Sequence, residues 1–356
     1  MRGRTDCVFQ ELAANQFETI RPLLGSIGHL LSATAVVEGT SPGRIWVDWP
    51  DHPSLALLRT PEGHMLAGDL PGSDCAASLK QLLVEQLYPR AREEGWWYFH
   101  FELPDQSWQA LLSDVLGVPC PVWIAREYYV MRSPKTDWRA DLPDGFEIRR
   151  VDRALLDGDS ASVERIRGWG EGSFGSLDAF LERGFGFCVT RGDEIVSWCI
   201  SDCVSGDRCE IGIHTAEPYR RRGLATCAAA ATVEHCLQNG LTHIGWHCDK
   251  VNVASAATAR AAGFEKERDY PAVQAWLNEV DSLLANGHIS QLEGRWAEAA
   301  DCFERALAQL DARTADALSS HIATGSDDIA RYRQRAACVR ALAEGTRPVD
   351  TPPPRT

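Results

Sequence analysis

One stretch near the middle of the chain constrains the fold more than any other, because strands and helices with recognisable ends alternate along it. A short apolar strand is predicted at Glu210–Thr215 and a second strand at His243–Cys248. The alanine-rich helix between them ends near Asn239-Gly240, a typical C-terminal cap. A second helix is opened by Asn252 and Ser255. The stretch is therefore predicted to run strand, helix, strand, helix.

The turn that joins the first strand to the first helix carries three arginines, Arg220 to Arg222, followed by Gly223. The first amides of a helix have no partners within the helix and lie at the positive end of its dipole. A glycine lets the backbone approach a ligand closely, and the small Ala225 and Thr226 leave room for one. The turn is therefore predicted to bind a phosphate or pyrophosphate, with the arginines adding positive charge around it.

Two common phosphate-binding motifs are excluded in this turn. A Walker loop would end in Gly-Lys-Ser/Thr, which is absent, and a dinucleotide fingerprint needs three glycines where this turn has one. A basic turn between a strand and a helix can also be a solvated loop or a packed corner, so the short motif alone leaves that alternative open.

The whole stretch resembles the GNAT superfamily of acyl-CoA-dependent N-acetyltransferases. The resemblance rests on Arg-x-x-Gly-x-Ala after a strand, then a second strand and an asparagine-initiated helix, and it covers roughly Gly145 to Tyr270. Trp246-x-Cys248 and Ala262-Gly263-Phe264 are typical of the subgroup in which a degenerate GNAT-like domain precedes the complete one. The resemblance implies an acyltransferase acting on groups other than amino-acyl. It would transfer an acetyl group from acetyl-CoA, its co-substrate, to a primary amine by direct attack in a ternary complex.

The resemblance also implies where acetyl-CoA binds. The two strands would splay apart, and the pantetheine arm would take backbone hydrogen bonds from Ile213 and Thr215, in the manner of an added strand. Asn252 and Ser255 would hold the pantetheine or thiol end from the other side. The implied cofactor-binding residues are Ile213, His214, Thr215, Arg220, Arg221, Arg222, Gly223, Leu224, Ala225, Thr226 and Asn252.

A proton must leave the acceptor during the reaction, because an amine with a pKa of ~10 is protonated at neutral pH. Glu210 is the best-placed carboxylate, and strand alternation puts it on one face with Gly212 and His214. Glu210 could serve as the base or as a structural hydrogen-bond acceptor, and His214 is the reserve base.

The acid that assists the leaving thiolate is less clear from the sequence. Many family members carry a tyrosine seven residues after the asparagine, where this chain has Ala259. Ser255 or Tyr270 would take over that role, or the thiolate would leave unassisted, since a thiol with a pKa of ~8.5 is a tolerable leaving group. The predicted catalytic residues are Glu210 and Ser255.

The expected fold is α/β (α+β), with two GNAT-like mixed-sheet domains in tandem and a C-terminal helical hairpin. The first domain lacks the cofactor loop, because Pro71-Gly72-Ser73-Asp74 precedes its long helix. In the second, Gly168–Gly175 is expected to be a loop that either borders the acceptor or simply connects two helices. The predicted division is a degenerate domain at 1–135, a linker at 136–144, a catalytic domain at 145–272, a helical extension at 273–345 and a disordered tail at 346–356.

The helical extension resembles the second half of a tetratricopeptide unit over Leu292–Leu307, where a glycine, an aromatic residue, then Ala, Phe and Ala-Leu follow at helical spacing. One such unit cannot bury its own apolar face, so a neighbouring helix at Asp327–Glu344 is expected to cover it. This extension keeps open an alternative function, a non-catalytic acyl-CoA-binding sensor or interaction protein.

Composition narrows the partners. A formal net charge of -14 argues against unspecific binding to nucleic acid or anionic membranes and suits a cationic acceptor. The expected partner is a small-molecule or peptidyl amine, and a homodimer is left open. Neither a signal peptide nor a run long enough to cross a membrane is recognised, so the chain is expected to be cytoplasmic.

The twelve cysteines are scattered and are expected to be thiols in a reducing compartment. No metal site is expected, because His243 and His247 share a face of their strand whereas Cys248 points the other way.

Overall fold

The computed structural model describes residues 7–312 and 326–346, which form two compact units. All but the first residue of the tail predicted at 346–356 lie outside the described residues. The first unit combines the described residues up to Pro71 with Glu102–Asp105 and Ala125–Tyr270, and the second combines Gly72–Phe101, Gln106–Ile124 and the described residues from Pro271 onward.

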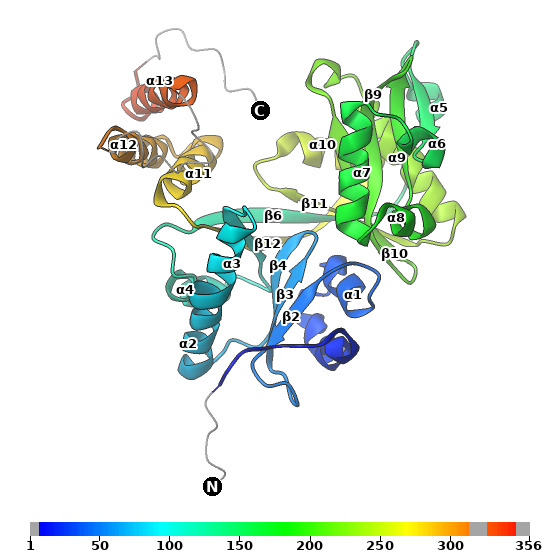
Figure 1. The fold of residues 1–356 in the computed structure, drawn as a ribbon. Coiled ribbons are helices and arrows are strands. Elements are labelled where there is room, and N and C mark those ends of the chain that lie inside the picture. The colour runs from blue at the N-terminus through cyan, green and yellow to red at the C-terminus, as the bar shows by residue number, and fades with distance from the viewer. Residues whose placement is uncertain (1–6, 313–325, 347–356) are drawn as a thin grey trace. The chain divides into compact units, whose positions relative to one another are not determined.

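The strands of the first unit belong to two runs of neighbours (Figure 1). The first run is antiparallel throughout. In the second run β10 and β11 pair in parallel, and the other pairs of known register are antiparallel. The first run consists of β1 (Gln10–Glu11), β2 (Arg44–Val47), β3 (Leu55–Thr60) and β4 (Gly63–Gly68). The second run consists, in spatial order, of β12 (Phe264–Trp276), β6 (Val122–Met131), β11 (His243–Asp249), β10 (Arg208–Thr215), β9 (Glu194–Ser205), β8 (Gly186–Arg191) and β7 (Glu147–Arg150). Parts of β6 and β12 belong to the second unit.

Helices cover both faces of the second run. Side chains of β9 alternate between them: Cys199 packs in the core under α9, whereas Trp198 and Ile200 pack under α7 and α8. The small residues of α9, such as Ala228 and Ala229, let that helix lie close to the strands. The helices of this unit are η1 (Ala14–Ile27), α1 (Leu31–Val37), α5 (Trp138–Asp141), α6 (Arg153–Leu156), α7 (Ala161–Phe174), α8 (Leu177–Arg183), η3 (Glu217–Tyr219), α9 (Leu224–Gln238) and α10 (Val253–Ala262).

The second unit holds β5 (Tyr98–Glu102) up to Phe101 and a C-terminal helical hairpin. Phe303 of the hairpin is fully buried beside Gly287, where an added Cβ would lie 2.5 Å from the ring. This close approach agrees with the expected tetratricopeptide-like pairing, and α13 covers it as expected. The helices are α2 (Ser73–Gln81), η2 (Leu82–Leu87), α3 (Tyr88–Glu93), α4 (Trp108–Val115), α11 (Glu279–Leu292), α12 (Trp296–Ala312) and α13 (Ser326–Ala343).

The expected glycine-rich loop at Gly168–Gly175 is wrong, because α7 continues to Phe174. Ser160 caps the helix by accepting a hydrogen bond from the Val163 amide, and Gly175 ends it with a φ of 86°. Gly170 faces the ring of Phe180 on α8, and an added Cβ there would lie 2.7 Å from Cγ. The glycine therefore allows two helices to pack closely, which compensates for its low helix propensity.

Two expected element boundaries also change. The sequence pattern predicts a helix over Phe9–Leu31, but this segment forms β1, the 3₁₀ helix η1 and the start of α1. Pro22 inside η1 cannot donate a backbone hydrogen bond, which disfavours a continuous α-helix. The sequence pattern also predicts a strand over Glu265–Pro271, whereas the strand β12 runs from Phe264 to Trp276.

Ten of the twelve cysteines are free. Cys7 and Cys75 are disulfide-bonded, which differs from the expectation of thiols throughout. Over the described ranges, no helix combines the length and apolar character that a bilayer crossing requires.

Alanine substitutions in α7 test the packing at its glycines. Gly170→Ala should lower the free energy of unfolding by about 1–3 kcal/mol, because the new methyl group overlaps the Phe180 ring. Gly168→Ala is the matched control: Gly168 is exposed and an added Cβ meets nothing within 4 Å. This control should raise stability by about 0.5–1 kcal/mol through helix propensity. Urea unfolding followed by circular dichroism measures both, and equal stability of the two variants would contradict the packing argument.

Candidate active site

The site is built where β10 and β11 part. The two strands pair only over Arg208–Glu210 with His243–Gly245. Farther along, β10 remains paired with β9 and β11 remains paired with β6, so each strand stays attached to its outer neighbour. The register of β10 against β9 shifts between Glu210 and Ile211 at the parting point. This geometry agrees with the splay predicted from the sequence.

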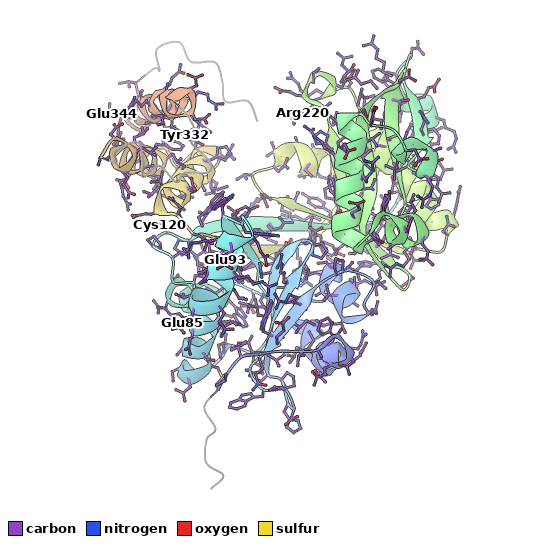
Figure 2. All side chains as sticks on the ribbon, in the orientation of Figure 1. Glu85, Glu93, Cys120, Arg220, Tyr332 and Glu344 are labelled. Carbon is purple, nitrogen blue, oxygen red and sulfur yellow. The ribbon has the colours of Figure 1, made fainter. Side chains whose placement is uncertain are left out.

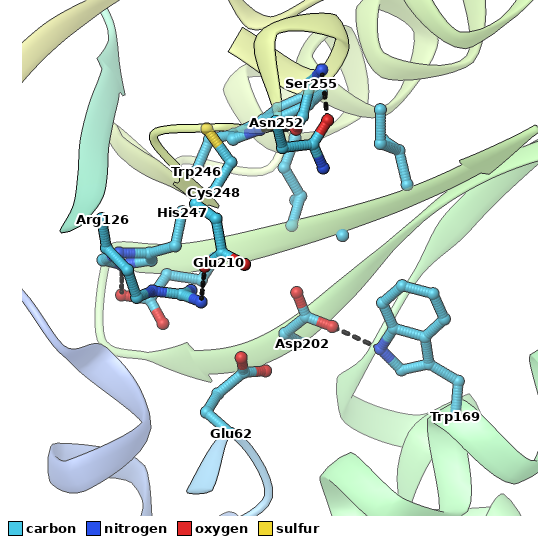
Figure 3. Close-up of a pocket in the computed structure, with 14 residues that line it drawn as sticks. Glu62, Arg126, Trp169, Asp202, Glu210, Trp246, His247, Cys248, Asn252 and Ser255 are labelled. Atoms are coloured by element: carbon cyan, nitrogen blue, oxygen red, sulfur yellow. Dashed lines mark hydrogen bonds and ion pairs between the residues drawn. The ribbon is translucent and has the colours of Figure 1, made fainter. Parts of the chain in front are cut away.

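A cavity of about 270 Å³ lies at this parting (Figure 3). Its walls come from strands, a hairpin turn and two helices of the first unit. The lining residues are Glu62, Arg126, Trp169, Asp202, Glu210, Ile211, Gly212, Ile213, Trp246, His247, Cys248, Asp249, Asn252 and Ser255.

Both carboxylate oxygens of Glu210 are engaged. Oε1 accepts a hydrogen bond from the Leu31 amide at the start of α1 (2.9 Å) and lies 3.0 Å from Nε2 of His247. Oε2 accepts one from the thiol of Cys203 (3.3 Å). Burial raises the pKa of Glu210, but these partners outweigh burial and hold that pKa below its usual value. Of the two roles that the sequence left open, these contacts favour the structural one.

The guanidinium of Arg126 is already paired. Its Nε lies 3.1 Å from Glu102 Oε1 and donates to the hydroxyl of Tyr270 (2.7 Å), while Nη1 donates to Asp249 (2.9 Å). Tyr270 also lies 2.9 Å from Nδ1 of His247, which joins this ion pair to the Glu210 cluster. The positive charge in the cavity wall is thus balanced by two carboxylates.

Asp202 and Glu62 differ from Glu210 in their hydrogen-bond partners and in the direction of their pKa shifts. Asp202 accepts a hydrogen bond from Nε1 of Trp169, and Glu62 lies in the two-residue turn between β3 and β4. Burial raises the pKa of Glu62 to about 7, with further increases from Glu102 and Glu210. Burial and the nearby Glu62 raise the pKa of Asp202 well above its ordinary value. The cavity therefore contains carboxyl groups that can take up a proton near neutral pH.

Gly212 lets the backbone of β10 lie against these groups. A Cβ added there would be 2.3 Å from Cζ2 of Trp169 and 2.8 Å from Oδ2 of Asp202. A side chain at this position would displace the indole or the carboxylate, so the shape of the cavity depends on the glycine.

The arginine-rich turn has the conformation expected of an anion site. Arg221 has a φ of 61° and Gly223 a φ of 80°, so the chain is left-handed just before α9 begins. No side chain of the described residues caps the helix at Gly223, which leaves its first amides without a capping partner. An added Cβ at Gly223 would meet nothing within 4 Å, so the backbone angle, not packing, requires glycine. The three arginines are exposed, and Figure 2 labels Arg220 in this turn.

The opposite wall is formed by the start of α10. Asn252 caps this helix by accepting a hydrogen bond from the Ser255 amide (3.1 Å). Oγ of Ser255 accepts a hydrogen bond from Nε1 of Trp246 (3.0 Å). Ala259 and Tyr270 are buried, and neither lines the cavity.

The predicted site residues fall into two groups. Glu210, Ile213, Asn252 and Ser255 line the cavity. The others lie outside its lining: His214 stacks on Trp198 with ring centroids 4.3 Å apart, and burial lowers its pKa. The remaining residues outside the lining are Thr215, Arg220, Arg221, Arg222, Gly223, Leu224, Ala225 and Thr226.

The sequence does not identify five acidic or basic side chains of the cavity as site residues. One signal points to this wall of the cavity, because the segment that contains Trp169 is predicted either to border the acceptor or to connect two helices. Glu62 lies in a different part of the chain, and no motif or spacing connects it to Glu210. The five side chains are those of Glu62, Arg126, Asp202, His247 and Asp249.

Comparisons with known proteins agree with this geometry. A relative, the uncharacterized N-acetyltransferase YdfB of Bacillus subtilis (strain 168), is 26% identical over 264 residues, which cover 74% of this chain and 97% of the relative. A GCN5-related N-acetyltransferase-like protein from Streptococcus suis 89/1591 shares the fold with a TM-score of 0.55 and 24% identity, covering 74% of this chain and 99% of that one.

A tandem GNAT protein from the clavulanic acid biosynthesis pathway aligns with a TM-score of 0.51 and 13% identity, over 76% of this chain and 98% of that one. This likeness supports the expected fold with two GNAT-like domains. The family model of GNAT acetyltransferases matches residues 22–273, well over half of the sequence. The chain therefore belongs to the GNAT acetyltransferase family and is an acyltransferase.

Proposed function

We propose that this acyltransferase transfers an acetyl group from acetyl-CoA to a primary amine by direct attack within a ternary complex. The observation that carries the proposal is the parting of β10 from β11, which has the cavity at its base. The left-handed turn before α9 follows on the same strand, β10. A thioester and an amine could thus meet at the cavity while the diphosphate binds at the turn.

The residues at the turn suit a diphosphate. The amides of Leu224, Ala225 and Thr226 begin a 15-residue helix, and the exposed arginines supply positive charge beside them. Ile213 and Thr215 would offer backbone groups on the side of β10 from which β11 has departed. The proposed binding set also includes His214 and Asn252, as expected from the sequence.

Ser255 is proposed to assist the leaving thiolate. Its Oγ accepts a hydrogen bond from Trp246, so its own proton can be donated into the cavity that it lines. Glu210 is proposed to act mainly by holding His247 and the start of α1 in place, since its two oxygens are already engaged. A positioned hydroxyl donor stabilises the developing thiolate.

The direct test measures binding and turnover separately. Calorimetry with acetyl-CoA reports binding, and thiol release from acetyl-CoA in the presence of primary amines reports transfer. Binding together with amine-dependent thiol release is the expected result. Binding without release for any amine would instead support the alternative, an acyl-CoA sensor. No heat with any acyl-CoA would overturn the whole proposal.

Gly223→Asp should abolish detectable acetyl-CoA binding, because it places bulk and negative charge at the proposed diphosphate site. Gly240→Asp is the matched control. Gly240 follows the other end of α9, is exposed, has a φ of 79° against 80° for Gly223, and likewise has nothing within 4 Å of an added Cβ. The control should bind acetyl-CoA like the wild type. Retained binding by Gly223→Asp would refute the assignment of the turn.

Glu210→Gln should lower kcat by about tenfold with the KM for acetyl-CoA unchanged, because the amide carries no charge to hold His247. Steady-state thiol release measures both constants. Glu265→Gln serves as control, since Glu265 is exposed and lies outside the cavity lining. Unchanged kcat in Glu210→Gln would remove Glu210 from the mechanism.

A further inference from the structure

The acidic side chains of the cavity differ in how many hydrogen bonds and ion pairs they make with other residues. Glu210 has a partner for each oxygen, and Asp249 is paired with Arg126. The carboxylate of Glu62 makes no hydrogen bond or ion pair with any described residue, although the side chain is half-buried. A carboxylate removed from water without a partner is costly, so a group that binds it would be strongly favoured.

The position of Glu62 and Asp202 suggests what that group is. Figure 3 shows both carboxylates directed into the same cavity, with the indole of Trp169 beside them. The hydrogen bond from Trp169 fixes the orientation of Asp202. The backbone of Gly212, close to Oδ2 of Asp202, places β10 and therefore the proposed thioester site next to this pair.

On the basis of the acetyl transfer proposed above, we infer that Glu62 and Asp202 together bind the ammonium group of the acceptor and accept the proton that it must lose before attack. Glu62 is then a catalytic residue contributed by the β3–β4 turn, far upstream of the cofactor-binding turn. Trp169 is a positioning residue, because it acts through Asp202 and offers an aromatic face beside the cation.

The proton transfers balance as follows. The ammonium group, RNH₃⁺, gives one proton to the carboxylate pair and becomes RNH₂. The nitrogen lone pair attacks the thioester carbonyl, the C–N bond forms, the C–S bond breaks and the thiolate of coenzyme A leaves. The second proton lost by nitrogen ends on that thiolate, and the carboxylate pair releases its proton to water. The net products are the amide, coenzyme A thiol and one proton.

The charges around Glu62 support a group that exchanges a proton near neutral pH. Glu102 and Glu210 favour its protonated form, whereas Arg126 and His247 favour the carboxylate. Glu62 in turn raises the pKa of Asp202. The resulting pKa of about 7 suits a base that must be free at working pH and yet able to hold a proton.

The same charges define the class of acceptor. Four side chains with carboxyl groups line the cavity, Glu62, Asp202, Glu210 and Asp249. The guanidinium of Arg126, which also lines the cavity, already pairs with Glu102 and Asp249. The lining therefore has no unpaired arginine or lysine, among the described residues, to bind a carboxylate on the acceptor. The expected substrates are cationic primary amines without a carboxylate beside the reacting nitrogen, and α-amino acids should be poor acceptors.

Two variants and one control test the inference with 1,4-diaminobutane as acceptor. Glu62→Gln should lower kcat/KM for the amine about 10²-fold at pH 8 and leave the KM for acetyl-CoA unchanged. In the wild type, kcat/KM should fall as the pH drops below about 7, because Glu62 becomes protonated. This limb should disappear in Glu62→Gln and persist in the control Glu265→Gln.

Asp202→Asn keeps an oxygen for Trp169 and should show a similar loss. If the two carboxyl groups act as a unit, the double variant should be little slower than either single variant. Thermal unfolding checks the fold, and Glu62→Gln should be at least as stable as the wild type because it removes an unpaired charge. A wild-type rate and pH profile in folded Glu62→Gln would overturn the inference while the acetyltransferase proposal stands.

A matched pair of acceptors tests the substrate class. Ornithine is 1,4-diaminobutane with a carboxylate on one amine-bearing carbon, so the two differ only in that charge. Wild-type kcat/KM should be at least about tenfold higher for 1,4-diaminobutane. Equal or higher values for ornithine would contradict the inferred site. A wild type that binds acetyl-CoA but acetylates neither amine would also contradict it, whereas failure to bind acetyl-CoA would overturn the proposed function itself.

Discussion

The structure of the site depends on two parallel strands, β10 and β11, that pair over only part of their length. β10 and β11 share hydrogen bonds over three residues each, and then each strand follows its own antiparallel neighbour. Beyond the parting, the outer pairings satisfy one edge of each strand, so the backbone groups on the other edge face the gap without a partner strand. The cavity, the proposed pantetheine path and the placement of Glu210 all follow from this parting.

Where the two strands part, Glu210 makes contacts with elements of the first unit that are far apart in sequence. Its carboxylate joins the first amide of α1, a thiol of β9 and an imidazole of β11. A buried charge is tolerated because donors surround it, and the same donors make it a weak proton acceptor. The environment that stabilises Glu210 thereby leaves proton transfer to less satisfied carboxyl groups, in keeping with the role inferred for Glu62 and Asp202.

Local sequence patterns predicted correctly those elements whose bounds depend on residues close in sequence. The sequence pattern predicts a strand over Val122–Met131 and a helix over Leu177–Arg183, and both elements have these bounds in the structure. The helix α9 ends where Asn239 and Gly240 predict its end. The patterns failed at α7, because three glycines usually indicate a loop and only the ring of Phe180 explains why Gly170 is helical. They failed again at η1, which is a 3₁₀ helix that contains Pro22 and not part of one continuous helix over Phe9–Leu31.

By itself the sequence determined the family and the α/β class and predicted the anion-binding turn, since a strand, a glycine and the start of a helix follow one another in contiguous residues. Only the tertiary structure decided which carboxylates share the cavity. Glu62 and Asp202 are 140 positions apart, and their meeting depends on how separate groups of strands pack within one unit. No local pattern records such a contact, because burial and neighbouring charges, which set the proton affinity of a side chain, arise only when the chain is folded.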